Sequence, residues 1–226
     1  MQSADLLKFL NQLPIFNSLD ANQLKKTANL ITPRHFKKGE FIILEGDTSP
    51  AFHIIQQGKV KVFKQSFSGK DFTIGIFHRG ESFGEVAVFD GKAYPASAQA
   101  MEETTVLTIG REEFLSLVAQ NPAIAINIIG IMGERIKSAH NRLRDLATDR
   151  VEQRLAKVLL MLSSKYGATL SFTRQEIADM TGTTTETTIR VMNRLKNAGI
   201  IRSSRGKIVI LDETKLLLLS DGPPRV

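Results

Sequence analysis

Glu186 and Arg190 carry opposite charges and stand four residues apart in a polar stretch near the end of the chain. On a helix, a spacing of four puts both side chains on the same face. There the carboxylate could accept a hydrogen bond from N4 of cytosine, and the guanidinium could bind O6 and N7 of guanine, so that the pair would read base edges in DNA. The alternative is a salt bridge between the two on a solvated helix, which contributes only about 0.2–0.5 kcal/mol.

The segment that carries this pair, residues 172–201, predicts two short helices joined by a tight turn. Thr173 opens a capping box at the start of the first helix. Gly182 supplies the left-handed backbone that ends it, and Thr183 or Thr184 can cap the second helix. The second helix should bury one side and expose the other, which is a helix-turn-helix pattern. The buried side is expected to hold Thr188, Val191, Met192, Leu195 and Ala198, and the exposed side Glu186, Arg190, Asn193, Arg194 and Asn197.

The stretch TRQEIADMTGTTTETTIRVMNRL resembles the helix-turn-helix of the cyclic-AMP receptor protein and fumarate–nitrate regulator (CRP/FNR) superfamily of bacterial transcription regulators. In that family, a Glu and an Arg at the positions of Glu186 and Arg190 read base edges. Ile189 stands where the family often has a small residue, and it could contact a thymine methyl group or pack inward. The resemblance implies a DNA-contacting set of Thr173, Arg174, Thr184, Thr185, Glu186, Thr187, Ile189, Arg190, Arg194, Arg205 and Lys207.

The residues from 200 to 211 predict a β-hairpin with a turn at residues 203–206, which is the wing of a winged helix. Arg202, Arg205 and Lys207 could reach phosphates beside the major groove. The alternative for these cations is a solvated turn.

In the first half of the chain, residues 36–110 contain short runs with period-two alternation, separated by Gly-containing turns. The runs FIILEG, FHIIQQG, KVKVFKQ, FTIGIF and TTVLTI predict strands, so we expect an antiparallel sandwich or jelly roll after two short helices within residues 4–32. The order of these runs resembles the effector-binding β-roll of the same superfamily. The expected fold is α+β: a cupin-like β-roll, a long dimerisation helix and a winged helix-turn-helix domain.

The segment from Phe83 to Ala100, here called the effector cassette, resembles the ligand-binding segment of that β-roll. Gly84 and Glu85 match the pair that holds ribose in cyclic-nucleotide binders, although Glu85 could instead be a turn residue that satisfies backbone donors. Tyr94 and Pro95 stand where an Arg-Ser or Arg-Thr pair would neutralise the cyclic phosphate. Since a buried phosphate without a cation is costly, cyclic AMP is not expected. The expected effector-binding residues are Phe83, Gly84, Glu85, Val86, Tyr94, Pro95, Ala96, Ala139 and His140.

The identity of the effector stays open between haem, a small organic molecule and no effector at all. The chain has no cysteine, which excludes a cysteine-bound iron–sulfur cluster and disulfides. Haem-based gas sensors occur in branches of the superfamily without the phosphate-binding Arg, and one of the four histidines, not assigned, would then be the axial ligand. Further branches of the superfamily bind small organic molecules in the same pocket. No metal site is predicted.

Residues 120–149 predict one long helix with a heptad seam. Such a seam needs a partner, and a parallel homodimer is the expected one; burial on the chain's own β-roll is the alternative. The expected dimerisation residues are Ala125, Ile129, Met132, Ile136, Ala139, Leu143 and Leu146. The predicted domains are therefore a β-roll domain at 1–120, a dimerisation helix at 121–149 and a DNA-binding domain at 150–226, with a hinge at Asp149 and Arg150.

Charge and composition agree with this scheme. Residues 1–120 contain 13 Lys and Arg against 13 Asp and Glu, whereas residues 121–226 contain 17 against 10, which accounts for the whole net charge of +7. A basic second half favours double-stranded DNA as its partner. The expected dimer would present two recognition helices and therefore read a palindromic operator; RNA polymerase is a further possible partner. No enzyme motif, membrane span or secretion signal is recognisable, so we expect a cytoplasmic protein without enzymatic activity. The competing function is a ligand-binding regulatory module that acts on a protein partner.

Overall fold

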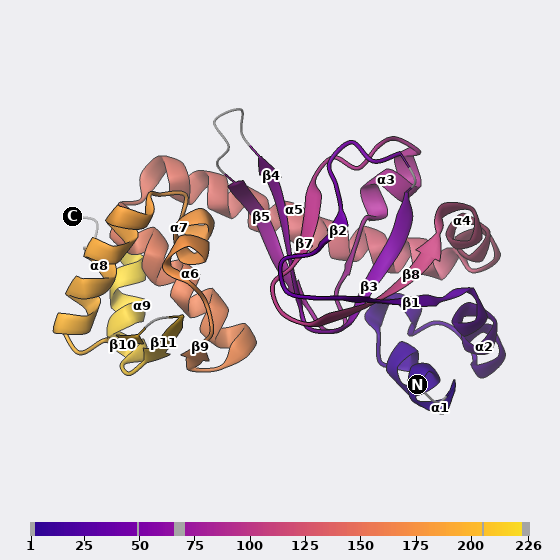
Figure 1. Ribbon diagram of the computed structural model, residues 1–226, viewed down its shortest axis with the longest axis horizontal. Coiled ribbons are helices and arrows are strands. Elements are labelled where there is room, and N and C mark those ends of the chain that lie inside the picture. The colour runs from indigo at the N-terminus through magenta and orange to yellow at the C-terminus, as the bar shows by residue number, and fades with distance from the viewer. Residues whose placement is uncertain (1–2, 49, 66–70, 205, 223–226) are drawn as a thin grey trace. The chain divides into compact units, whose positions relative to one another are not determined.

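The computed structural model describes residues 3–48, 50–65, 71–204 and 206–222, so that the predicted phosphate contact Arg205 lies outside the described residues. The chain divides into two compact units, Met1–Ile136 (unit 1) and Lys137–Val226 (unit 2). Figure 1 shows the elements of both units. The division falls within a long helix, and the domain boundaries expected at 120/121 and 149/150 stay predictions.

Unit 1 is built around two antiparallel four-stranded sheets (Figure 1). One sheet has the order β1-β8-β3-β6 and consists of β1 (Thr32–Phe36), β8 (Thr104–Gly110), β3 (Ala51–Gln57) and β6 (Ser82–Phe83). The other has the order β2-β7-β4-β5 and consists of β2 (Phe41–Ile43), β7 (Ser97–Ala100), β4 (Lys59–Gln65) and β5 (Asp71–His78). The predicted antiparallel β-roll is thereby confirmed.

Each sheet contributes side chains to a core shared between them. Ile43, Val60 and Ala98 from one sheet pack with Ile55 and Val106 from the other. The opposite face of β3 and β8 is covered by helices, which explains why four consecutive residues of β3 are buried. The covering elements are α1 (Ser3–Asn11), the 3-10 helix at Pro14–Phe16, α2 (Ala21–Leu30) and α4 (Arg111–Gln120).

The predicted long helix is α5 (Pro122–Thr148), and its first turns pack on unit 1. Ile124 and Ile128 are buried in the core under α4, and Met132 is packed against that core. Burial on the β-roll, which was the alternative to a dimer seam, is therefore realised for Met132. No single described helix is long and apolar enough to cross a membrane, although α4 and α5, bent by 110°, pass that test of length and composition as a pair.

Three of the remaining seam positions face away from the core of unit 1, whereas Ala125 is half-buried. Ile129, Ile136 and Leu143 are 67%, 54% and 63% exposed. Ile126, which the seam did not include, is 69% exposed. The core of unit 1 covers the flank of α5 that contains Ile128 and Met132. The exposed apolar stripe in the first half of α5 is therefore displaced from the predicted seam toward Ile126.

Unit 2 contains α6 (Val151–Tyr166), α7 (Arg174–Thr181), α8 (Thr185–Asn197) and a three-stranded sheet in the order β10-β11-β9. The wing is confirmed as β10 (Ile201–Ser204) paired with β11 (Lys207–Ile210). The short β9 (Thr169–Leu170) and a last helix, α9 (Glu213–Asp221), were not predicted. Ala198, expected on the buried side, is exposed because α8 ends at Asn197 and Ala198 is its C-cap.

Candidate functional site

The turn between α7 and α8 is fixed by its caps. Thr173 accepts a hydrogen bond from the backbone of Glu176 at 3.2 Å, and the Glu176 carboxylate accepts from the backbone N–H of Thr173 at 2.6 Å, which completes the predicted capping box. Gly182 has a φ of +69°, and a Cβ there would lie 2.7 Å from Cδ2 of Leu146. Only glycine suits both the left-handed backbone and the close contact.

The second helix of the motif, α8, is anchored by its buried side. Thr184 caps it by accepting from the backbone N–H of Thr187 at 3.2 Å. The buried residues are Thr188, Val191, Met192 and Leu195. The anchor therefore holds the opposite face of α8 outward, as the sequence predicts.

Glu186 and Arg190 lie on this outward face, and both are exposed. Neither forms an ion pair or hydrogen bond with another described residue, and they do not pair with each other. The alternative interpretation of the two as a solvated i,i+4 salt bridge is therefore not realised in the described part of the chain. Both groups keep their full hydrogen-bonding capacity for a ligand.

The threonine hydroxyls at the start of α8 are already engaged. Thr185 donates to the side chain of Gln175 on α7, and Thr184 donates to Oγ1 of Thr187 at 3.0 Å. Ile189 is 39% exposed, so the alternative in which it packs inward is wrong.

The predicted phosphate contacts come from α7, α8 and the strands of the wing. Arg174, in the first turn of α7, donates to Oγ of Ser203 in the wing at 3.2 Å and so links the two elements. Arg202 and Lys207 are exposed on the wing strands. Arg194 is exposed, but its guanidinium forms an ion pair with the carboxylate of Glu152 on α6. A DNA phosphate would have to compete with this carboxylate for Arg194.

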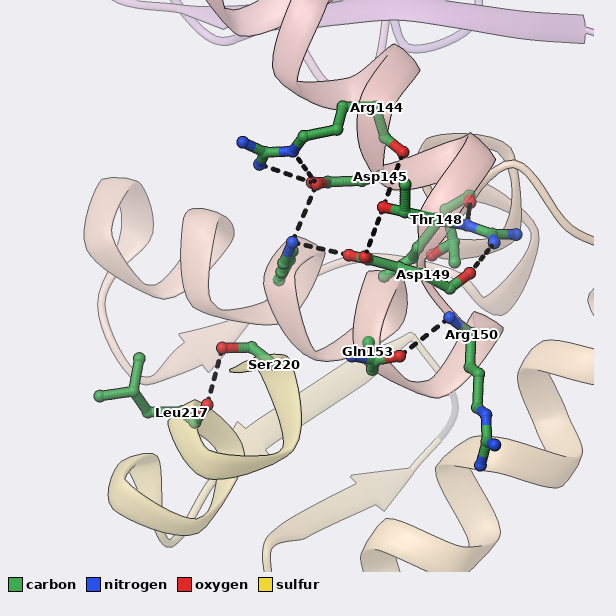
Figure 2. A network of polar contacts seen from close by, with 11 residues as sticks. Arg144, Asp145, Thr148, Asp149, Arg150, Gln153, Leu217 and Ser220 are labelled. Atoms are coloured by element: carbon green, nitrogen blue, oxygen red, sulfur yellow. Dashed lines mark hydrogen bonds and ion pairs between the residues drawn. The ribbon is translucent and has the colours of Figure 1, made fainter. Parts of the chain in front are cut away.

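The junction between α5 and α6 is held by a polar network within unit 2 (Figure 2). The ammonium group of Lys157 donates to Asp145 at 2.9 Å and to Asp149 at 2.7 Å. Arg154 donates to the backbone oxygen of Asp149 at 2.8 Å and to that of Thr181, just before the turn, at 3.1 Å. Asp149, one of the two predicted hinge residues, is thus bound to α6, and through Arg154 it is linked to the helix-turn-helix.

The network is reflected in the pKa values of its charged groups. The hydrogen bond from Lys157 is the main cause that lowers the pKa of the Asp149 carboxyl. Burial alone would lower the pKa of Lys157, but the hydrogen bonds and charges of the two carboxylates outweigh it and raise that pKa. Asp149 and Lys157 are therefore ionised together at neutral pH.

The effector cassette begins at the turn between β6 and α3 (Glu85–Asp90). Gly84 has a φ of +88°, and a Cβ there would lie 2.7 Å from the backbone oxygen of Ala51. Glu85 is only 6% exposed and is bound by the guanidinium of Arg135 on α5. Burial raises the pKa of Glu85, and the charge of Arg135 acts in the opposite direction.

Arg135 was not among the predicted site residues, although it occupies a flank of the heptad seam. Its guanidinium also donates to the backbone oxygen of Ser82 at 2.6 Å and lies 4.7 Å from the centre of the Phe77 ring. The second carboxylate oxygen of Glu85 is buried and has no hydrogen-bond partner among the described residues. The Glu85 carboxylate therefore binds the guanidinium of Arg135 from α5. The interpretation of Glu85 as a turn residue that satisfies backbone donors did not predict this ion pair.

Tyr94 is buried and hydrogen-bonded rather than open to a ligand. Its hydroxyl accepts from the backbone N–H of Ala51 at 2.6 Å, donates to the backbone oxygen of Ala51 at 3.0 Å and lies 3.1 Å from Nε2 of His53. Nδ1 of His53 lies 3.2 Å from Oγ1 of Thr108. Burial, with a smaller contribution from Arg34, lowers the pKa of His53 to about 3, so the imidazole is neutral.

The remaining predicted effector residues are spread over the chain. Phe83 is buried and stacks on His53, whereas Val86 and Pro95 are exposed and Ala96 is half-buried. Ala139 and His140 belong to unit 2, and both are exposed.

The four histidines, all of them described, do not offer a free buried ligand for haem. His53 is buried, and both of its ring nitrogens are engaged. His35 and His140 are exposed, and His78 lies 3.6 Å from the carboxylate of Glu81. Within the described ranges, no group of three or more His, Asp or Glu could hold a metal ion.

Comparisons with known proteins agree with the geometry of both units. Residues 33–121 match the cyclic nucleotide-binding domain family, and residues 153–219 match the Crp-like helix-turn-helix domain family. The cyclic AMP receptor protein of Thermus thermophilus is 28% identical over 204 residues, which cover 90% of this chain and 94% of that protein. The CRP-like cAMP-activated global transcriptional regulator of Mycobacterium tuberculosis is 26% identical over 217 residues, which cover 92% and 97%.

Solved structures show the same architecture. The Thermus thermophilus regulator TTHA1359, of the CRP/FNR family, aligns with a TM-score of 0.68 at 27% identity over 84% of this chain and 99% of that one. The c-di-GMP responsive regulator CLP of Xanthomonas campestris aligns with a TM-score of 0.76 at 20% identity over 84% and 99%, which supports the fold alone. A nucleotide-binding-type β-roll, a long helix and a Crp-like helix-turn-helix occur here in one chain. It belongs to the CRP/FNR family of effector-controlled, DNA-binding transcription regulators, which are not enzymes.

Proposed function

We propose that this regulator acts as a homodimer and reads an inverted-repeat DNA site with Glu186 and Arg190. The observation that carries the proposal is that both side chains are exposed on the outward face of α8 and have no partner among the described residues. A free carboxylate and a free guanidinium at this spacing match the major-groove edges of cytosine and guanine. Arg174, Arg202 and Lys207 would contact the backbone and set the register of the helix on the duplex.

The dimer would form along α5. Ile126, Ile129, Ile136 and Leu143 leave a row of exposed aliphatic side chains on a helix of 27 residues. Such a row is typical of a helix that packs against a second one. Two copies of α8 related by a twofold axis can enter successive major grooves about 34 Å apart, which accounts for an inverted repeat.

The effector would bind at the effector cassette and is a small organic molecule rather than cyclic AMP or haem. Tyr94 supplies no cation for a cyclic phosphate, and its hydroxyl is committed to Ala51 and His53. The buried imidazole of His53 has both ring nitrogens engaged, which leaves neither for iron. An effector can control DNA binding only if it binds the two arrangements of the dimer with different affinity. The regulator would act in the cytoplasm, and RNA polymerase would be a further partner.

Selection of binding sites from a random duplex library with the full-length protein tests the proposal. We expect an inverted repeat to be enriched, with a C·G or G·C pair in each half. Arg190→Ala should cost about 1–3 kcal/mol on that site and relax one base position. Lys26→Ala, which removes one exposed cation from α2 in unit 1, is the matched control and should leave specificity unchanged.

Two outcomes would contradict the proposal. If Arg190→Ala weakened binding to the same extent on every sequence, Arg190 would contact the backbone instead of a base. If no sequence were enriched, the protein would act through something other than sequence-specific DNA, and the competing function as a module that binds a protein partner would be favoured.

A further inference from the structure

Unit 1 contains a cleft of about 510 Å³ that is separate from the effector cassette, because none of the residues that line it lies between Phe83 and Ala100. Its walls come from the end of α2, the edge strand β1, the start of β3 and the junction of β8 with α4 (Figure 1). We call it the α2–α4 cleft, and its lining includes Arg34 and Glu113. Its volume is within the range of binding sites for small molecules.

Two opposite charges line the α2–α4 cleft without pairing. The side chains of Arg34 and Glu113 are exposed, and neither forms an ion pair or hydrogen bond with another described residue. An exposed Arg or Glu is common by itself, and an acidic residue is favoured in the first turn of any helix, where Glu113 stands. Opposite charges in one cleft attract each other, however, and these two leave each other unpaired. A ligand that carries both a carboxylate and an ammonium group could bridge them.

Gly110 makes room for the Glu113 carboxylate at the edge of the cleft. Its φ is −60°, which any residue can adopt, so the backbone dihedral does not require glycine. A Cβ at Gly110 would instead collide with the carboxylate of Glu113. The missing side chain therefore gives this carboxylate its place against the end of β8.

Part of the lining is held in place by the buried network of Tyr94 and His53. The backbone N–H and oxygen of Ala51 are bound to the Tyr94 hydroxyl, and Oγ1 of Thr108 lies 3.2 Å from Nδ1 of His53. Both Ala51 and Thr108 line the cleft. This part of the wall is therefore fixed before a ligand arrives, which lowers the entropic cost of binding.

We propose that the α2–α4 cleft binds a small zwitterion of the amino-acid class, with its carboxylate on Arg34 and its ammonium group on Glu113. A guanidinium can hold a carboxylate by two parallel hydrogen bonds, and a carboxylate accepts hydrogen bonds from an ammonium group. Leu30 and Pro50, which also line the cleft, would contact an aliphatic side chain. The cleft would be a second ligand site of the regulator, and it does not depend on the DNA contacts proposed for α8.

Isothermal titration calorimetry of the full-length protein with leucine tests the site, and we expect saturable binding of one molecule per chain. 4-Methylpentanoate lacks the ammonium group of leucine, and 3-methylbutylamine lacks its carboxylate. Each should bind more than about tenfold more weakly, because each loses one charge-assisted interaction. The dipeptide leucyl-leucine carries the same two charged groups, and tighter binding of it would support the site with a short peptide as its ligand.

Variants of the two charged residues locate the binding. Arg34→Gln and Glu113→Gln should each weaken leucine binding more than about tenfold. Gly110→Ala keeps both charges but displaces the Glu113 carboxylate, so it should weaken binding as well. The matched controls are Lys38→Gln and Glu112→Gln, which change exposed charges close in sequence that do not line the cleft. Both should bind leucine like the wild type, and thermal unfolding checks that every variant is folded.

Several results would overturn the proposal. If leucine, valine, isoleucine and leucyl-leucine all showed no saturable binding up to about 10 mM, the cleft would not be a site for this class of ligand. If the analogues that lack one charge bound as tightly as leucine, recognition would not use both charges. Binding that survived both Arg34→Gln and Glu113→Gln would lie elsewhere on the protein. None of these results bears on sequence-specific DNA binding, which the selection from a random library tests separately.

Discussion

Arg135, one residue before the point at which the two compact units divide, donates a hydrogen bond to the carboxylate of Glu85 in the effector cassette. The two residues lie 50 positions apart in the sequence. Glu85 is nearly buried, and Arg135 keeps less than a third of its side chain exposed. This ion pair therefore couples the start of α3 to the middle of α5, which is the helix that would carry a signal to unit 2.

Replacement of Arg135 by Met should destabilise unit 1. It would leave the Glu85 carboxylate buried without its cation, at a cost of about 3 kcal/mol in the free energy of unfolding at neutral pH. The pKa of Glu85 is already raised by burial, and removal of the opposing charge should raise it further. A protonated carboxyl needs no cation, so the loss should shrink as the pH falls through the folded-state pKa. Urea unfolding of wild type and variant at several pH values measures this.

The double variant Glu85→Gln with Arg135→Met gives the control for that experiment. Because the buried charge is then absent, it should be more stable at neutral pH than Arg135→Met alone. Equal stability of the two variants would mean that Glu85 is not the group that Arg135 stabilises.

The buried imidazole of His53 should make the protein sensitive to acid. Its pKa is about 3 in the folded protein and about 6.5 when unfolded, so only the unfolded chain takes up a proton between these values. The contribution of this group to stability is complete above pH 6.5, is lost as the pH falls below it, and levels off near pH 3. At pH 5 the loss is about 2 kcal/mol.

Urea unfolding at pH 8 and pH 5 tests this expectation with two variants. His53→Gln should reduce the difference between the two pH values. His140→Gln, which changes an exposed histidine on α5, should leave it as in the wild type. The same pH dependence in all three proteins would show that other groups cause the acid sensitivity.

Thr188 should be a position at which a single change stabilises the protein. Its side chain is fully buried in α8, and its hydroxyl has no hydrogen-bond partner within the described ranges. Valine has nearly the same shape without the hydroxyl, so Thr188→Val should raise the free energy of unfolding by about 1 kcal/mol. Thr181→Val is the contrasting variant, because that buried hydroxyl donates to the backbone oxygen of Ile177 at 2.7 Å. Thr181→Val should lower the free energy of unfolding. A similar effect of both changes would contradict the interpretation that the Thr188 hydroxyl is buried without a hydrogen-bond partner among the described residues.

The sequence was most informative where local rules decide the structure. Capping at Thr173, the left-handed Gly182 and the period of the buried residues on α8 all follow from neighbours within a few positions. They were confirmed, except that Ala198 is exposed. The α9 helix escaped prediction because the run of leucines from 216 to 219 has no helical period in its pattern. Leu216 is buried while Leu217 and Leu218 are exposed, which only tertiary contacts reveal.

The candidate effector site was less accessible to prediction, since its contacts join distant segments. The partners of Tyr94 are Ala51 and His53, and the partner of Glu85 is Arg135. No periodicity or spacing connects these positions. The sequence did single out Gly84 and Glu85 as a match to the ribose-holding pair of the family and Tyr94 as a departure from its pattern. The resemblance could not show that the chain's own side chains engage Glu85 and Tyr94.

Gly133 should show how closely two copies of α5 approach. On the helical wheel it falls between Ile126 and Ile129, at the centre of the exposed apolar stripe, and a Cβ there would meet nothing within 4 Å in the described part of the chain. Glycine within a helix costs about 0.5–1 kcal/mol relative to alanine, so the lone chain gains nothing from it. A partner helix packed on the stripe could approach α5 closely at Gly133, because no side chain stands there. We therefore expect Gly133→Ala to weaken dimerisation by about 1–3 kcal/mol through overpacking.

Gly130→Ala is the matched change, because a Cβ at Gly130 also meets no described atom within 4 Å but lies to one side of the stripe. It should stabilise α5 by about 0.5–1 kcal/mol and leave the dimer intact. Sedimentation equilibrium gives the dimer dissociation constant, and thermal unfolding gives the stability of each variant. If Gly133→Ala behaved like Gly130→Ala, with a more stable helix and unchanged association, the partner would not approach α5 at this stripe. The dimer would then have to use another part of the molecule, and the exposed isoleucines of α5 would need a different explanation.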